Sequence, residues 1–371
     1  VHNVRRCLGE GADSPFYKNG ERLVTNVTTF IAFLVVFSIL VFFHEFGHFI
    51  AAKSVGIKVE EFALGYGPKL FGFYLGETFY ALRIFPLGGF CKMAGEEMEP
   101  GSSEVVEDVE PERLFMNKPV LARMLTVAAG PFLNFILAAV LFVLVFHTAG
   151  VPTVVVHEVL QDWPAEEAGI QQHDEIIAVN GKGPSFEEII MNINANAGNP
   201  IDVTIVRDGK EMTVRAVPRY NPEAQAGQLG ISLTYTYIKK GFLRALRTGI
   251  DFTISTSRTV LVGIWQMIAG KIKADVAGPV GLVQMVGTTA QYGILSLIFF
   301  TARLSVNLGL LNLFPVPILD GGWILFLAIE GFRGRPIEAQ YRSFAQLVGI
   351  ALLLLLMVFA TYRDITRLSS L

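Results

Sequence analysis

The sequence predicts a polytopic α-helical membrane protein with about four transmembrane helices and an inserted α+β domain. Of its 371 residues, 52% are hydrophobic and 17% are charged, whereas about 25% of the residues in an average soluble protein are charged. The excess of apolar residues is concentrated in a few long runs. A stretch with strand and helix patterns separates the second run from the third, and we expect a membrane-associated β-hairpin region after the first run.

Charge and cysteine content narrow the possible functions. The formal net charge of −3 gives no indication of a nucleic-acid partner. Cys7 and Cys91 lie far apart, so we expect neither a disulfide framework nor a cysteine-based metal site. Residues 1–23 are polar and loop-like, and they form either a short ordered N-terminal extension or a leader upstream of a natural start near Val24.

The first predicted span, Val24–Ala52, ends in a His-Glu-x-x-His motif. His44 and His48 are four residues apart, so on a helix they lie on one face and can supply two ligands of a Zn²⁺ site. Glu45 lies beside them, where it could take a proton from the attacking water. Each ionisable residue in a span costs about 2.5–3.5 kcal/mol on insertion scales, which favours a function. For this motif alone, two interfacial histidines are the alternative.

The region between the first and second spans contains aromatic runs broken by glycine, which predict β-hairpins. The run that includes Gly88 and Gly89 is too apolar for a free loop. We expect it to dip into the membrane boundary or to line a groove, with a small core hairpin as the alternative. Glu96–Glu112 is acidic and is expected to be a solvated, mobile loop without chemistry.

The second predicted span, Val120–Thr148, completes the first half of a membrane domain at residues 24–150. Its Ala129-Gly130-Pro131 sequence predicts a kink. Asn134 follows within the same span, and an intramembrane asparagine usually faces protein or a cavity. It is therefore either a helix–helix contact or part of a substrate path.

Residues 151–222 are predicted to form a soluble domain of strand, short helix, strand, turn, helix and hairpin, the last around Asp208-Gly209. This order resembles a PDZ domain, a fold that binds an extended peptide as an added strand at a sheet edge. His173 stands where such domains usually have glycine, which puts the local turn geometry in doubt. We interpret His157 and His173 as surface histidines.

Residues 223–290 are predicted to form a linker and an amphipathic helix region. A helix is expected at 241–272, on the membrane surface or within the membrane, and a turn at 277–281. The second half of the membrane domain, residues 291–371, contains predicted spans at Tyr292–Leu313 and Phe344–Thr361.

The third span leads into a segment with two prolines and two glycines, which must break the helix at membrane depth. Asp320 in this break is a natural third ligand, since three protein ligands plus a water are typical of catalytic zinc. The alternative is that Asp320 caps a helix starting at Gly321. The short basic loop 330–342 is typical of a cytoplasmic connection.

Together, the His44-Glu45-x-x-His48 motif and the late Asn312-x-x-Pro-x-Pro-x-x-Asp320-Gly motif resemble the site-2 protease family of intramembrane zinc metalloproteases. A single PDZ domain between the second and third spans resembles the bacterial regulator-of-sigma-E protease type. The resemblance covers about residues 25–365. It implies that His44, His48 and Asp320 bind zinc and that Glu45 activates the attacking water.

The resemblance also implies how a substrate is held. Asn312 would hydrogen-bond the substrate backbone or stabilise the oxyanion, and the Gly88-Gly89 hairpin would pair with the unwound substrate. Substrates would be single-pass membrane proteins already trimmed by another protease, such as anti-sigma factors, or leftover signal peptides. Membrane lipid is a further expected partner.

Four spans place both termini on one side of the membrane and loop 330–342 on the other, with the histidine motif. The positive-inside rule then puts the active site near the cytoplasmic face of the inner (cytoplasmic) membrane and the PDZ domain outside, although the basic N-terminal tail opposes this assignment. Two other functions are a membrane-anchored PDZ scaffold with a structural metal site and an ion transporter. A scaffold does not need Glu45, and the sequence lacks the internal repeats that transporters often have.

Overall fold

A computed structural model gives the fold of residues 15–96, 109–181, 183, 186–222, 224–272 and 278–369. The predicted acidic loop lies mostly outside these residues, as do Cys7 and the first 14 residues of the predicted extension. The chain divides into two compact units, Val143–Thr248 and the larger Val1–Phe142 with Gly249–Leu371.

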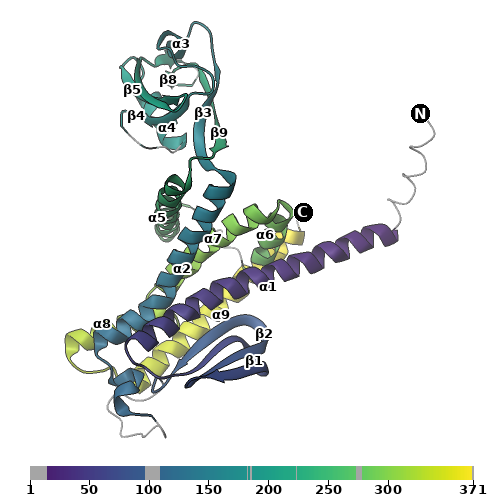
Figure 1. Cartoon of the computed structure of the whole chain (residues 1–371), viewed down its shortest axis with the longest axis vertical. Coiled ribbons are helices and arrows are strands. Elements are labelled where there is room, and N and C mark those ends of the chain that lie inside the picture. The colour runs from purple at the N-terminus through teal and green to yellow at the C-terminus, as the bar shows by residue number, and fades with distance from the viewer. Residues whose placement is uncertain are drawn as a thin grey trace. The chain divides into compact units, whose positions relative to one another are not determined.

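Four helices are long and apolar enough to cross a membrane (Figure 1): α1 (Pro15–Ser54), α2 (Val120–Ala149), α7 (Ile294–Asn312) and α9 (Ala339–Ser369). The predicted number of four spans is thus confirmed for the described residues. α1 begins at Pro15, so residues 15–23 are helical and not loop-like as predicted. Proline is common at the start of a helix, because it has no backbone N–H and the N–H groups of the first turn have no partner within the helix. α5 (Phe242–Ile268) lies within the predicted helix at 241–272 and ends four residues before its predicted end. The relation of α5 to the membrane stays a prediction.

The predicted turn at 277–281 is wrong from Pro279 onward, because the helix α6 (Pro279–Gln291) begins at that residue. Asp364 of α9 accepts hydrogen bonds from the backbone N–H groups of Gly278 (3.1 Å) and Gly281 (2.7 Å). These bonds satisfy N–H groups that have no partner within the helix. The Gly-Pro pair therefore starts a helix because a carboxylate far along the chain caps it.

Strands β1 (Val59–Leu75) and β2 (Thr78–Met93) form an antiparallel sheet beside α1 (Figure 1), which confirms the predicted β-hairpin region. The register shifts along the pair, so Ala63 lies opposite both Ala81 and Phe90 of β2. The start of β1 is buried, as for Val59, whereas Tyr74 near its end is 74% exposed. The base of the sheet is thus a core hairpin, and contact of its exposed aromatic end with the membrane stays a prediction.

The larger unit also contains two short 3₁₀ helices, Pro111–Arg113 and Phe115–Asn117, and helix α8 (Asp320–Arg333). Phe115 is buried and packs edge-on against Trp323 of α8. The turn between β1 and β2 is attached to this region, since Glu77 forms ion pairs with Lys53 (2.5 Å) and Arg113 (2.6 Å).

The smaller unit contains a five-stranded antiparallel sheet in the order β6-β5-β4-β3-β9. Its elements are β3 (Val151–Val159), α3 (Pro164–Glu167), β4 (Glu175–Val179), α4 (Phe186–Ala195), β5 (Ile201–Arg207), β6 (Lys210–Ala216), the pair β7 (Arg219–Asn221) and β8 (Ala226–Gln228), and β9 (Ile231–Ile238). The order expected for residues 151–217 is present. β9 joins the sheet beside β3, beyond the predicted domain end at residue 222.

His173 adopts a left-handed backbone conformation with φ of 71°, at the position where a PDZ domain usually has glycine. Its N–H donates to the carbonyl of Val156 over 2.8 Å, so the turn into β4 is retained. A side chain in this region costs about 1–2 kcal/mol relative to glycine. His157 and His173 are both exposed, as predicted.

Candidate metal centre

The C-terminal part of α1 carries both histidines of the motif on one face. The Nε2 atoms of His44 and His48 lie 3.4 Å apart, and the rings are nearly perpendicular. α1 approaches α2 closely at this level, because a Cβ at Gly47 would lie only 2.3 Å from the carbonyl oxygen of Ala129. Small residues allow this kind of close helix packing within a membrane.

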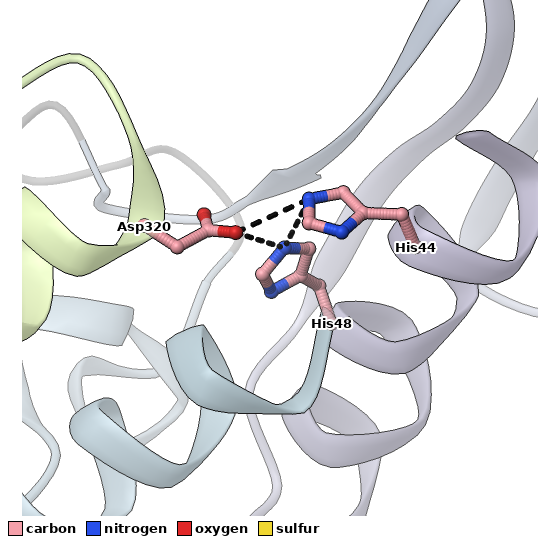
Figure 2. Close-up of side chains that lie close together, drawn as sticks. All are labelled: His44, His48 and Asp320. Atoms are coloured by element: carbon pink, nitrogen blue, oxygen red, sulfur yellow. Dashed lines mark hydrogen bonds and ion pairs between the residues drawn. The ribbon is translucent and has the colours of Figure 1, made fainter. Parts of the chain in front are cut away.

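Asp320 is the first residue of α8, and Leu319 is the N-cap residue, so Asp320 does not occupy the cap position considered from the sequence. The segment between α7 and α8 folds tightly against the start of α8. A Cβ at Gly321 would lie 2.2 Å from the carbonyl oxygen of Phe314, and a Cβ at Gly322 would lie 2.3 Å from that of Val316. The two glycines therefore permit the turn that directs Asp320 toward α1 (Figure 2).

His44, His48 and Asp320 form the His-His-Asp group, whose side chains converge in Figure 2. The Oδ2 atom of Asp320 lies 3.1 Å from Nε2 of His44 and 3.6 Å from Nε2 of His48. Tetrahedral zinc with ligand distances of about 2.0–2.2 Å holds neighbouring ligand atoms about 3.3–3.6 Å apart. The three separations, including the 3.4 Å between the Nε2 atoms, therefore fit three corners of such a site.

Hydrogen bonding within the group is consistent with this fit. Asp320 Oδ2 is buried and has no hydrogen-bond partner among the described residues, although it faces two imidazole nitrogens. A buried carboxylate oxygen without a donor is costly, and a cation would satisfy it. No other cluster of three metal-ligating side chains is found in the part of the chain that the structure describes.

The opposite edges of both rings face α2. His48 Nδ1 lies 3.0 Å from the carbonyl oxygen of Thr126, to which it can donate. His44 Nδ1 lies 3.2 Å from the side-chain amide of Asn134. Gly130 lies between these two positions along α2, and a Cβ there would lie 2.2 Å from His48 Nε2. The predicted kink sequence thus contains a glycine that makes room for a ring of the group.

Glu45 lies between the His-His-Asp group and β2. Its charge interacts with all three residues of the group, and the backbone N–H of Cys91 donates to its carboxylate. A Cβ at Gly89 would lie 3.2 Å from Glu45 Cγ and 2.9 Å from the carbonyl oxygen of Ala63. Burial raises the pKa of the Cys91 thiol above its ordinary value.

Tyr66 covers the glycine pair of β2. Its Oη donates to the carbonyl oxygen of Gly89 over 3.0 Å. Gly88 has a φ of +117°, and a Cβ there would lie 2.2 Å from the Tyr66 ring. Burial and the negative charge of Glu45 raise the pKa of Tyr66, so its hydroxyl remains a donor.

The structure also brings the two predicted asparagines to His44. The Nδ2 atom of Asn312, the last residue of α7, lies 3.4 Å from His44 Nε2 and 3.5 Å from its Nδ1. Asn134 is fully buried, and its backbone carbonyl accepts a hydrogen bond of 2.7 Å from Ser305 of α7. It thus makes the helix–helix contact that was one of its two predicted roles.

A buried ion pair connects α8, which carries Asp320, to the start of α2. Arg123, only 3% exposed, donates to Glu330 over 2.5 Å and 3.2 Å in a bidentate arrangement. Its Nε donates to the backbone carbonyl of Lys118. This pair was not predicted, nor were the roles of Thr126, Gly130 and Tyr66. The sequence feature that could have predicted this ion pair is the position of Arg123, just inside the predicted span Val120–Thr148.

Comparison with known proteins identifies the family. The model for peptidase family M50 matches residues 32–356. The regulator of sigma-W protease RasP of Bacillus subtilis is 33% identical, over 92% of this chain and 99% of its own length. A putative zinc metalloprotease of Clostridium perfringens is 37% identical, over 90% of this chain and 97% of its own.

Among solved structures, the PDZ domain of an SdrC-like protein from Listeria monocytogenes is similar to 22% of this chain and 87% of its own, at 22% identity. Its TM-score of 0.20 is too low to support a conclusion about the fold. The sequence relatives are different, because they match nearly the full chain and include enzymes named as zinc metalloproteases. The chain therefore belongs to peptidase family M50, the site-2 protease family, and is a zinc-dependent metalloendopeptidase with membrane-spanning helices.

Proposed function

We propose that His44, His48 and Asp320 hold the catalytic zinc ion and that Glu45 is the general base. The observation that carries this proposal is the set of three separations within the His-His-Asp group, 3.1, 3.4 and 3.6 Å. When bound there, zinc would act as a Lewis acid that polarises the scissile carbonyl and makes water nucleophilic at neutral pH.

Glu45 would take the proton of the attacking water and pass it to the departing amine. Its position supports this role, since its carboxylate is held by the N–H of Cys91 and interacts with the whole His-His-Asp group. The side chain also has little freedom on the β2 side, where even a Cβ at Gly89 would crowd it. A fixed base within reach of the reacting water is what general-base catalysis requires.

The scissile peptide would lie between Asn312 and the Gly88-Gly89 segment. The Asn312 amide lies 3.4 Å from a proposed ligand atom of His44, so it can donate to the substrate backbone or to the developing oxyanion. A helical peptide bond is shielded, so the substrate must unwind before attack. Pairing with β2 as an added strand would give the freed backbone groups new partners.

The substrates would be transmembrane segments of single-pass membrane proteins, either anti-sigma factors or remnant signal peptides, in regulated intramembrane proteolysis. The proposed site lies near the end of a candidate membrane span, which supports a substrate that is cleaved within the membrane. We assign the active site to the cytoplasmic side and the five-stranded unit to the outside, following the basic loop 330–342. The five-stranded unit would act as a PDZ domain that binds peptide at a sheet edge.

Zinc content measured beside cleavage tests the proposal. The full chain in detergent, purified as wild type, Glu45→Gln and Asp320→Ala, would be analysed for zinc and incubated with a model transmembrane peptide. We expect about one zinc per chain in wild type and in Glu45→Gln, and a lower content in Asp320→Ala. Cleavage should be lost in both variants, because one lacks the base and the other a ligand.

Two outcomes would contradict the assignment. Cleavage by Glu45→Gln at the wild-type rate would remove Glu45 from the base role. Unchanged zinc in Asp320→Ala would remove Asp320 from the ligand set, whatever the cleavage rate. Zinc in the wild type without cleavage of any tested span would reject the tested peptides as substrates.

A further inference from the structure

The two histidines of the His-His-Asp group contact α2 in the same way. In each ring Nε2 faces Asp320, and Nδ1 faces a polar group of α2. For His48 that group is the carbonyl oxygen of Thr126, which can only accept a hydrogen bond. Nδ1 of His48 must therefore carry the proton, and the lone pair of Nε2 is left free for a metal.

For His44 the partner is the side-chain amide of Asn134, which can either donate or accept. The atom placed 3.2 Å from His44 Nδ1 is Nδ2, while Oδ1 of the same amide is buried without a partner among the described residues. A donating Nδ2 would require an unprotonated Nδ1, and a neutral ring would then carry its proton on Nε2. That proton would occupy the lone pair which faces Asp320 and which the proposed zinc site requires.

Exchanging the oxygen and nitrogen of this amide removes the conflict. The two orientations fill the same volume, and oxygen and nitrogen are assigned from the hydrogen-bond network. With Oδ1 toward the ring, Asn134 accepts a hydrogen bond from Nδ1–H of His44. The arrangement then matches that of His48, and it is the usual outer contact of a metal-binding histidine.

On this basis, which rests on the proposed zinc site, we propose that Asn134 is a positioning residue that accepts the Nδ1 proton of His44 through Oδ1. It selects the tautomer whose Nε2 binds zinc and fixes the plane of the ring. Complete burial of Asn134 supports this role over contact with a substrate. Its backbone is also fixed, since Ser305 donates to its carbonyl over 2.7 Å.

Two substitutions test whether Asn134 acts as a hydrogen-bond acceptor or in some other way. Asn134→Asp keeps the shape and the acceptor but loses the amide donor, whereas Asn134→Leu keeps most of the volume and loses the acceptor. Ser305→Ala is the matched control, because it removes a hydrogen bond from the same residue without touching the amide. His44→Ala is the reference for loss of a ligand.

The experiment measures zinc affinity of the full-length protein in detergent by competition with a chromogenic chelator. We expect Asn134→Leu to lower affinity about 10- to 100-fold, the usual effect of removing the outer partner of a metal-binding histidine. Asn134→Asp and Ser305→Ala should remain within about threefold of wild type. The absorption spectrum of the cobalt-substituted protein should change in Asn134→Leu and remain in Asn134→Asp.

Equal loss of affinity in Asn134→Asp and Asn134→Leu would overturn the proposal, because the acceptor would then not matter. Wild-type affinity in Asn134→Leu would overturn it as well. An equal loss in Ser305→Ala would assign Asn134 a purely structural role. In each of these cases, zinc that binds tightly to the wild type and is lost in His44→Ala leaves the proposed zinc site intact. The same low affinity in wild type and in His44→Ala would refute both the zinc site and the role of Asn134.

Discussion

Replacing Gly130 by alanine tests the packing behind the metal centre most directly. The new Cβ would lie 2.2 Å from His48 Nε2, 2.6 Å from Cε1 and 2.8 Å from Cδ2. An ordinary contact begins at 3.4 Å, so the ring must move by about 1.2 Å. Metal–ligand distances tolerate only about 0.2 Å. His48 would therefore cease to be a ligand, and we expect zinc affinity to fall by more than about 100-fold, beyond the effect of losing an outer partner.

The control is Gly331→Ala in α8, where a Cβ would meet only Val120 Cγ1 at 3.6 Å. Both substitutions put alanine in a helix, which by itself favours folding by about 1 kcal/mol. Chelator competition and thermal unfolding in detergent would be measured for both variants. Full zinc affinity in Gly130→Ala, with affinity lost in His48→Ala, would refute the described approach of α2 to the ring.

Three further predictions concern the surroundings of the site. Glu330→Gln leaves a buried guanidinium without its counter-charge, so the free energy of unfolding should fall by about 3 kcal/mol; an unchanged thermal midpoint would contradict this. Tyr66→Phe frees the Gly89 carbonyl, and the KM for a transmembrane peptide should fall about two- to tenfold, the equivalent of one neutral hydrogen bond; a higher KM would assign the hydroxyl to substrate binding. Hydrogen bonds, first from Lys53, lower the pKa of Glu77, so its stabilisation is present above its unfolded pKa of about 4.3 and is lost as the pH falls through the folded value. Thermal midpoints of wild type and Glu77→Gln should therefore differ at pH 7, and the difference should shrink as the pH falls below about 4.3.

Most of the correct predictions depend only on residues that are close together in the sequence. His44 and His48 share a face because any helix places residues four apart on one side. The four spans follow from apolar runs of sufficient length, and the hairpin at Asp208-Gly209 follows from the turn preference of that pair. None of these predictions depends on a partner elsewhere in the chain.

Predictions were wrong or missing where a distant residue decides the outcome. Gly278-Pro279 fits a turn or a helix start equally well, and the capping carboxylate of Asp364 favours the helix. β9 belongs to the sheet only because β3 has a free edge beside it. Gly130 is recognisable as a helix-weakening residue in any sequence, but its contact with His48 depends on how closely α1 and α2 approach.

One face of α2 contacts both histidine rings of the His-His-Asp group. Thr126, Gly130 and Asn134 follow one another at intervals of four residues. The backbone carbonyl of Thr126, the side-chain hydrogen of Gly130 and the side-chain amide of Asn134 therefore lie along one side of the helix. Thr126 and Gly130 contact His48, and Asn134 contacts His44. The order of contacts runs in opposite directions along α1 and α2, as consecutive membrane spans require. Substitutions on this face should therefore lower zinc affinity first, whereas changes at Phe132 on the exposed side of the same helix should leave zinc affinity unchanged.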